Sequence, residues 1–257
     1  MKTTDPVRVD CGPCPYLPDR WWHSDAVFVQ DITPAELDPM LEQGYQRFGQ
    51  SLYLPNCTGC SECIPIRLNV HDFRPSRTQR RVVKRNQDLR ITVAPPLATP
   101  DSYALYRRFM EVRFPRSVPP TEDWFRFLLE THFGFTLQLS YWDGPRLAGF
   151  GVIDPATTGV YSYMFAWDLE YEARRLGAFS LLHEVDYCLK TGRDFLYLGL
   201  FVHDCRSMNY KANFKPYELR NARGEWCAYG ADSAVRAAAR GAASGAASGA
   251  ASGAEAD

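Results

Sequence analysis

The sequence predicts a mixed α/β (α+β) fold, in which a smaller cysteine-bearing N-terminal domain precedes a larger domain of sheet and helices. Three observations support this prediction. Five cysteines and a run of arginines are concentrated in the first 90 residues, apolar residues alternate from Phe135 to Tyr141, and a long amphipathic stretch lies between Ala178 and Leu189. With 257 residues and 46% hydrophobic content, the chain is long enough to bury a core in one large or two small domains.

Helices are marked by capping signals and by apolar residues at helical spacing. Thr33 and Glu36 form a capping box around a proline, so a helix is expected to begin there and to end before Gly44. Helical spacing recurs over residues 102–113, and Thr121 is expected to cap a further, aromatic-rich helix.

Strand signals dominate the second half of the chain. The alternation that starts at Phe135 runs into the turn sequence Asp143-Gly144, and further strands are expected over residues 147–153 and 159–167. Next we expect an amphipathic helix that stops at Gly192, a buried strand over residues 195–202, and short strands around Tyr217 and Trp226. Hairpin, strand, helix, strand is the order of a GNAT-like acyltransferase domain.

These signals divide the chain into three parts. Residues 1–90 are expected to form a Cys/Arg-rich N-terminal domain, residues 91–230 a GNAT-like domain, and residues 231–257 a disordered Ala/Gly/Ser tail. The polar first ten residues do not resemble a signal peptide, and no apolar run approaches the roughly 18 residues of a membrane helix. We therefore expect a cytoplasmic protein with reduced thiols and no membrane partner.

Cysteines at short spacings predict a metal site. Deprotonated sulfur is a strong ligand for zinc and for iron–sulfur clusters, and two groups of cysteines about 40 residues apart resemble a split site that folds around its ion. The alternative is that some of them are ordinary buried thiols. Five candidates compete for four places: Cys11, Cys14, Cys57, Cys60 and Cys63.

Arginines follow the last of these cysteines directly. Between Arg67 and Arg90, eight Lys or Arg residues stand against two Asp residues, although the whole chain has a net charge of −1. Guanidinium groups suit bidentate phosphate contacts and stacking on unpaired bases, so this stretch predicts RNA binding. A solvated charged face is the alternative. The candidate RNA contacts in this stretch are Arg67, Arg74, Arg77, Arg80, Arg81 and Arg85.

Two later segments carry further candidate site residues. Arg174, Arg175 and Gly177 open the long helix after a strand, and this pattern resembles the loop that cradles pyrophosphate in acyl-CoA transferases. Tyr210 and Lys211 follow the buried strand, where polar groups past a strand end suggest a site, although a turn with solvated lysines would look the same. No P-loop is present, and no nucleotide cofactor is expected.

Several motifs together resemble the arginyl/leucyl-tRNA–protein transferase family of the N-end rule pathway. The matching words include Cys14-Pro-Tyr-Leu-Pro-Asp-Arg20, Tyr53-Leu-Pro-Asn-Cys57 with Cys60 and Cys63, Phe73-x-Pro-Ser-Arg77-x-Gln-Arg80-Arg81, Arg175-Leu-Gly177, and Cys205-x-x-Met208-x-Tyr210-Lys211-x-x-Phe214-x-Pro-x-Glu218. The resemblance extends from about Cys11 to Glu218. The motifs together are specific for the family, although each motif alone is not.

The resemblance implies an enzyme that moves leucine or arginine from charged tRNA to the N-terminal amine of proteins exposing Asp or Glu, which marks them for degradation. Its partners would be Leu-tRNA or Arg-tRNA and such acceptor proteins, and relatives hold an iron–sulfur cluster or another metal on N-terminal cysteines. The compact form with the spaced cysteines is typical of leucyltransferases. A non-catalytic tRNA-binding or metal-sensing protein and an acyl-CoA-dependent GNAT enzyme are the alternatives.

An aminoacyl ester is already activated, so the enzyme needs mainly proximity and removal of a proton from the attacking ammonium. Asp168 and Glu218 are candidates for binding the amine or accepting its proton. Tyr210 and Lys211 are candidates for stabilising the oxyanion or the leaving ribose hydroxyl. Arg174, Arg175 and Gly177 would hold the tRNA near the sheet.

Overall fold

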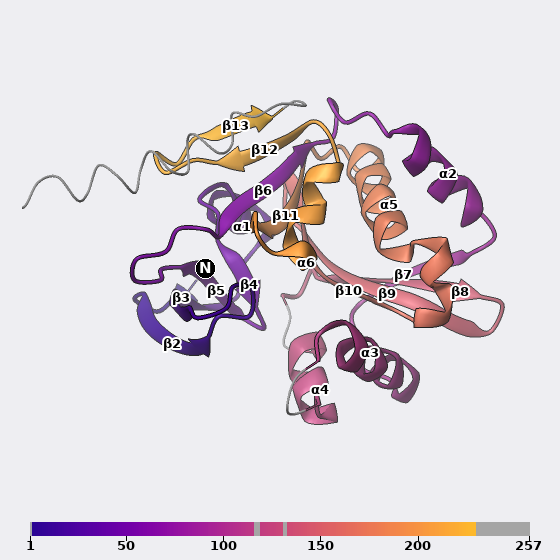
Figure 1. The fold of residues 1–257 in the computed structure, drawn as a ribbon, viewed down its shortest axis with the longest axis horizontal. Coiled ribbons are helices and arrows are strands. Elements are labelled where there is room, and N and C mark those ends of the chain that lie inside the picture. Colours follow the sequence, from indigo (N-terminus) through magenta and orange to yellow (C-terminus); the bar gives the residue numbers. More distant parts are fainter. Residues whose placement is uncertain (1, 116–118, 131–132, 230–257) are drawn as a thin grey trace, which may run out of the picture.

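The computed structural model describes residues 2–115, 119–130 and 133–229 and contains two sheets (Figure 1). The smaller sheet comes from the first 55 residues, and the larger sheet has eight strands in the order β13-β12-β6-β11-β10-β9-β8-β7. The predicted mixed α/β fold, with a smaller sheet at the N-terminus, is confirmed. Among the residues described, no helix is long and apolar enough to cross a bilayer.

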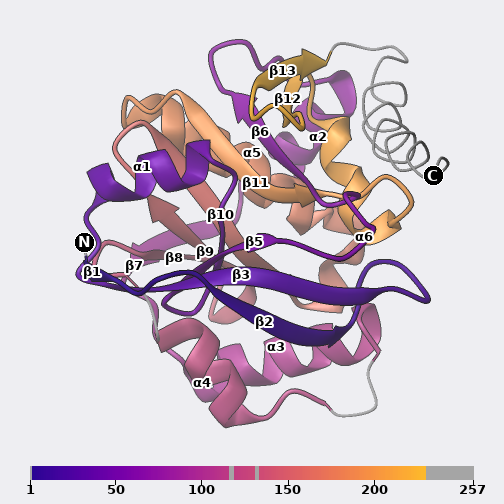
Figure 2. The same ribbon diagram turned by 90° about the vertical axis from the view of Figure 1, so that its left-hand side faces the viewer.

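The smaller sheet is antiparallel and centres on β3. Its strands are β1 (Lys2–Thr3), β2 (Val7–Pro13), β3 (Trp21–Gln30), β4 (Gln46–Phe48) and β5 (Ser51–Pro55). Figure 2 shows the long strands β2 and β3 running across one side of the molecule, and β5 pairs with β3. Helix α1 (Pro34–Glu42) leads from β3 to β4, and the predicted capping box of Thr33 and Glu36 is present at its start.

The larger sheet is mostly antiparallel, with one parallel pair at its centre. Its strands are β6 (Ile64–Asn69), β7 (Arg90–Ala94), β8 (Leu137–Asp143), β9 (Arg146–Pro155), β10 (Gly159–Trp167), β11 (Phe195–Phe201), β12 (Tyr217–Arg220) and β13 (Trp226–Tyr229). Strands β10 and β11 run parallel because α5 (Leu176–Lys190) crosses between them. The predicted order of hairpin, strand, helix and strand is confirmed by β8, β9, β10, α5 and β11.

Helices cover both faces of the larger sheet (Figure 1). Helices α2 (Arg77–Arg85) and α5 lie on one face, while α3 (Pro100–Arg113) and α4 (Glu122–Glu130) lie on the other. Short turns follow the two central strands: η1 (Leu169–Arg174) after β10, and α6 (Arg206–Asn209) with η2 (Tyr210–Asn213) after β11. Tyr141, Leu139 and Leu182 are buried between the sheet and α5. On the other face, Phe125 of α4 and Phe150 of β9 are buried in one cluster with residues of α3.

A third core joins the two sheets. Leu52 of β5 packs in the same buried cluster as Tyr161 of β10. Beside it, Arg47 of β4 makes an ion pair of 2.7 Å with Asp154 of β9, and both side chains are fully buried. Thr136 donates a further hydrogen bond to that carboxylate. The sheets are therefore fastened by apolar packing and by a buried charge pair.

The eight-stranded sheet extends across the predicted domain boundary at residue 90. Strand β6 lies between β11 and β12, and α2 packs on α5, although both come from the first 90 residues. The sequence prediction contained neither element, because the arginines dominate the segment 77–85 and obscure its capping box of Ser76 and Gln79. The predicted tail, residues 231–257, lies outside the described residues.

Candidate active site

A cavity of about 770 Å³ opens where the central parallel strands end. Residues that line it come from the end of β10, the start of α5, the end of α3, and the α6–η2 turn after β11. The carboxyl ends of parallel strands are the common place for sites in α/β proteins. Four predicted site residues meet in this cavity: Arg175, Gly177, Tyr210 and Lys211.

Arg175 and Gly177 form the junction between η1 and α5. Arg175 adopts a left-handed backbone conformation (φ 57°), which ends η1 and starts α5 at once. Its side chain is exposed at the cavity, and the positive end of the helix dipole lies beside it. A Cβ on Gly177 would lie 3.4 Å from the ring of Trp167, an ordinary van der Waals contact, so the start of α5 packs close to that ring. This junction suits an anionic ligand.

Lys211 brings a buried amine to the cavity. Its side chain is only 8% exposed, and Nζ donates a hydrogen bond of 2.7 Å to the carbonyl oxygen of Leu200. Desolvation lowers the pKa of Lys211 to about 7, against the effect of the thiols of Cys205 and Cys63. The neighbouring Tyr210 is exposed toward the same cavity.

Two arginines absent from the sequence prediction also line the cavity. Arg113, at the end of α3, pairs with Glu172 and lies over the ring of Trp167 at 5.2 Å. Arg206, at the start of α6, is exposed and has no ion-pair partner among the residues described. With Arg175 they bring positive charge to the cavity from three separate elements. Only the fold brings them together, so no local sequence signal marked them.

Buried polar groups lie behind the cavity wall. Ser162 of β10 and Ser180 of α5 line the cavity, and Ser180 Oγ donates a hydrogen bond of 2.8 Å to Oε1 of Glu184. Glu184 is fully buried, and burial raises the pKa of its carboxyl to about 7. Sequence reasoning passed over Glu184, although an acid between Leu181 and Cys188 on the apolar face of a helix is a detectable signal.

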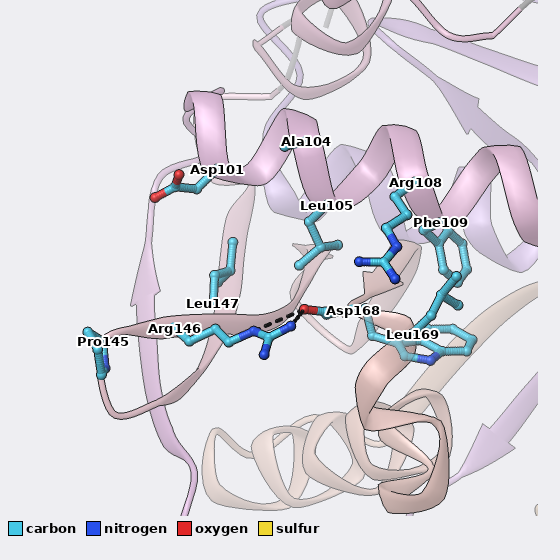
Figure 3. A pocket seen from close by; sticks show the side chains of 11 residues that line it. Asp101, Ala104, Leu105, Arg108, Phe109, Pro145, Arg146, Leu147, Asp168 and Leu169 are labelled. Carbon is cyan, nitrogen blue, oxygen red and sulfur yellow. Dashed lines mark hydrogen bonds and ion pairs between the residues drawn. The ribbon is translucent and has the colours of Figure 1, made fainter.

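Asp168 lies at a different hollow from the other predicted catalytic residues. Figure 3 shows its carboxylate bonded directly to Arg146, and both residues line a hollow of about 410 Å³ between α3 and the β9–β10 strands. Asp168 also accepts a hydrogen bond from the backbone of Glu170 and so caps η1. Trp167 and Phe109 line both hollows and separate them. Asp168 therefore holds the turn that presents Arg175.

Arg67 and Glu218 are each other's partners. Arg67 of β6 is buried, its Nε lies 2.6 Å from Glu218 of β12, and a second contact of 2.5 Å joins it to Glu42. Aromatic rings enclose the guanidinium, with Phe195 at 3.9 Å and Trp226 at 4.3 Å. The structure thus places the predicted phosphate contact and the predicted proton acceptor in one interior ion pair, away from the cavity.

The remaining predicted RNA contacts lie on or beside α2. Arg74, Arg80 and Arg85 donate hydrogen bonds to backbone carbonyls, Arg85 to that of Ala173 in η1. Arg174 bonds to Asn86 at 3.0 Å and to Asp88, and so fixes α2 to η1. Exposed side chains without ion-pair or hydrogen-bond partners in the described part of the chain are Arg77, Arg81 and Lys84.

Four of the five predicted metal ligands lie together. Cys14, Cys57, Cys60 and Cys63 line one small cavity of about 20 Å³, and burial, with the other three thiols as neighbours, raises the pKa of Cys63 to about 12. Cys11 lies apart, with its Sγ 3.4 Å from Ser24 Oγ. Thiols are the donors that zinc and iron–sulfur clusters prefer. In the present arrangement of the described residues, no three His, Cys, Asp or Glu side chains are placed so that together they could hold a metal ion.

Comparison with known proteins identifies relatives over about four fifths of the chain. Residues 12–81 match the family model "Arginine-tRNA-protein transferase, N terminus", and residues 101–221 match "Arginine-tRNA-protein transferase, C terminus". The "Aspartate/glutamate leucyltransferase" of Saccharophagus degradans is 32% identical over 213 residues, which is 80% of this chain and 89% of that protein. That of Chromohalobacter salexigens is 32% identical over 217 residues, or 82% and 87%.

A solved structure titled "Tandem GNAT protein from the clavulanic acid biosynthesis pathway (without AcCoA)" is also similar, with 16% identity and a TM-score of 0.39, and the match covers 89% of this chain and 65% of that one. The two family models together span most of the described residues, and the C-terminal model contains every residue that lines the cavity. The chain belongs to the arginine-tRNA–protein transferase family.

Proposed function

We propose that this protein transfers leucine from leucyl-tRNA to the N-terminal amine of proteins that begin with Asp or Glu, in the cytoplasm. The observation that carries the proposal is the cavity itself. A helix start, three arginines and a buried lysine meet at the carboxyl ends of the parallel strands, in a chain of this transferase family. Leucine is preferred to arginine as the donor because the similar bacterial proteins are named leucyltransferases.

The tRNA would approach over α2. Arg77, Arg81 and Lys84 are exposed there without partners among the described residues, and α2 packs on α5, whose first turn borders the cavity. Cations along one helix contact phosphates without reading the sequence. From this face the acylated 3′ end would pass Arg175 and enter the cavity. Arg67 is left out of this surface because its charge is matched inside the sheet.

Transfer would take place between Lys211, Tyr210 and the start of α5. The amine nitrogen of the acceptor attacks the ester carbonyl, the carbon–oxygen bond to the ribose breaks, and the ribose oxygen leaves as a hydroxyl. Lys211 Nζ and the Tyr210 hydroxyl are donors that can stabilise negative charge on the carbonyl or ribose oxygen. The arginines at the cavity also suit the acidic side chain of the acceptor.

The test is a transfer assay with purified protein. Radiolabelled leucyl-tRNA and arginyl-tRNA are each incubated with peptides that begin Asp, Glu, Arg or Ala, and labelled peptide is measured. We expect leucine on the Asp and Glu peptides. Transfer from neither tRNA would contradict the proposal. Binding of both tRNAs with no transfer would favour a non-catalytic RNA-binding protein, and acylation from an acyl-CoA alone would favour a GNAT enzyme of another kind.

We also propose that Cys14, Cys57, Cys60 and Cys63 hold a zinc ion or an iron–sulfur cluster. When bound, the metal would cross-link the β2–β3 turn to the loop between β5 and β6. Metal content, and absorption at about 400 nm after anaerobic purification, distinguish the two. Cys11→Ser is the matched control, because Cys11 lies outside the four-thiol cavity. We expect Cys14→Ser to lose metal and Cys11→Ser to keep it; the opposite pattern would contradict the assignment.

A further inference from the structure

Glu184 is a buried acid with no cationic partner among the residues that the structure describes. Its side chain is 1% exposed, no ion pair to it is found within the described residues, and its second oxygen, Oε2, is buried without a hydrogen-bond partner. Its one strong hydrogen bond comes from Ser180, 2.8 Å from Oε1. An unpaired acid in the interior costs stability, so its place behind a cavity wall calls for a functional reason.

The groups that face Glu184 form a hydrogen-bonded chain. The hydroxyl of Tyr141 in β8 donates a hydrogen bond of 3.3 Å to Ser180 Oγ. This Tyr141 hydroxyl also lies 3.3 Å from Nδ1 of His183. Ser162 of β10 is the other hydroxyl beside the carboxyl. The remaining titratable neighbours are Tyr210 of η2 and Cys188 of α5, whose pKa values are raised by burial and, to a smaller extent, by Glu184. Among these groups only His183 is a base, and desolvation lowers its pKa, so none of them places a positive charge beside Glu184 near neutral pH.

Both serines beside Glu184 also line the cavity. A hydroxyl can pass a proton on by donating its own hydrogen while it accepts another. Ser180 therefore links the interior carboxylate to the space where the acceptor amine must sit. Ser162 of the neighbouring strand lies beside the same carboxyl and also lines the cavity, so it can serve as a second link.

We propose that Glu184 is the proton acceptor of the transfer reaction and works through the hydroxyls of Ser180 and Ser162. This inference rests on the function proposed above. The ammonium of the acceptor loses two protons as the new amide bond forms. One goes to the ribose oxygen as the ester bond breaks, and the other passes through the serine hydroxyls to the Glu184 carboxylate and later to solvent. Glu184 itself does not touch the substrate.

The test compares Glu184→Gln with wild type in single-turnover leucyl transfer from about pH 6 to about pH 8. Glutamine keeps the shape of the side chain and an acceptor for Ser180 but cannot take a proton. We expect a loss on the order of 10²-fold or more at the upper pH. The ratio of wild-type to variant rate should rise roughly tenfold across this range and level off, because Glu184 ionises near the middle of it. Taking the ratio cancels the titration of the acceptor amine.

Asp186→Asn is the matched control, since it removes a half-exposed carboxylate from the same helix. We expect it to behave as wild type, with leucyl-tRNA affinity unchanged in both variants. A rate within about threefold of wild type for Glu184→Gln, or a loss with a constant ratio across pH, would overturn the proposal. If Glu184→Gln does not fold, the double variant Ser162→Ala, Ser180→Ala must show the same rising ratio, and an unchanged rate would overturn the proposal. Absence of transfer by wild type overturns the proposed function, whereas normal transfer by Glu184→Gln overturns this inference alone.

Discussion

Arg67 of β6 and Glu184 of α5 are both buried, but only Arg67 has partners of opposite charge within the described ranges. Two carboxylates and three aromatic rings surround Arg67, so its charge is matched on all sides. Glu184 has only neutral hydroxyl and thiol neighbours apart from the weakly basic His183. A matched charge indicates a structural role, whereas an unmatched acid beside a cavity indicates a role in the chemistry.

The effect of Glu184→Gln on stability should depend on pH. The carboxyl pKa rises from 4.5 to about 7 on folding, so wild type loses stability as pH climbs through this interval while the glutamine variant does not. We expect the difference in free energy of unfolding, variant minus wild type, to be about 2 kcal/mol larger at about pH 8 than at about pH 5. Urea unfolding at the two pH values measures it; a difference that does not change with pH would refute the burial argument.

Lys211 should be needed for transfer and not for tRNA binding. Lys211→Met keeps the apolar stem and removes the donor from the cavity, so we expect the transfer rate to fall on the order of 10²-fold. Binding of leucyl-tRNA, measured by filter retention, should be unchanged. Lys215→Met is the control, because Lys215 is exposed and does not line the cavity. Equal effects of the two substitutions would contradict the role given to Lys211.

Local pattern identified Tyr210, Lys211, Arg175 and Gly177, because each lies just past a strand or at a helix start, where position along the chain already indicates a site. Pattern could not separate Arg67 from the arginines of α2, since all belong to one basic run. Their difference arises from pairing: Arg67 is on a strand whose neighbour, β12, supplies Glu218 from 151 residues away. Such a partner is visible only in the folded chain.

Helix α2 has one face that packs against the rest of the molecule and one exposed, basic face. Gln79 and Val82 are buried against the rest of the molecule, and Asn86 at the end of the helix bonds to Arg174. Arg77, Arg81 and Lys84 face solvent. The helix therefore holds its basic side chains at a fixed place relative to the start of α5. The sequence predicted the basic segment but not the helix, because the many arginines obscure the capping box at Ser76.

Neutralising the cationic face should weaken tRNA binding and its salt dependence together. In the triple variant Arg77→Gln, Arg81→Gln, Lys84→Gln, the slope of log affinity against log salt should fall by roughly 3, about one for each lost phosphate contact. Titration of leucyl-tRNA at several salt concentrations measures the slope. A control triple variant neutralises Arg107, Arg108 and Arg126 on α3 and α4, where each is already paired with a glutamate. An unchanged slope in the α2 variant would show that the tRNA binds elsewhere.

The two sheets of the molecule meet at a buried ion pair as well as at an apolar core. Arg47 comes from the smaller sheet and Asp154 from the larger one, and the guanidinium also lies 4.3 Å from the ring centre of Tyr163. A buried charge that loses its partner is costly, whereas removal of both charges costs much less. This pair therefore makes the stability of the whole chain sensitive to either residue alone.

A double-mutant cycle tests this coupling between the sheets. Arg47→Met should lower the free energy of unfolding by about 3–5 kcal/mol, because it leaves Asp154 buried without its cation. Adding Asp154→Asn should recover part of that loss. Chemical denaturation of the single and double variants gives the coupling energy. Additive effects would mean that the pair does not link the sheets.

The position of β6 in the larger sheet has a consequence for how the chain is made. Residues 64–69 leave the ribosome early, yet their two hydrogen-bonding neighbours, β11 and β12, are made of residues 195–201 and 217–220. Until those are synthesised, β6 exposes two unpaired edges and the Arg67 charge has neither Glu218 nor the rings of β11 around it. The larger sheet is therefore complete only after β12 has been synthesised. A translational pause or truncation before residue 217 would leave an edge of β6 unpaired and prone to aggregation.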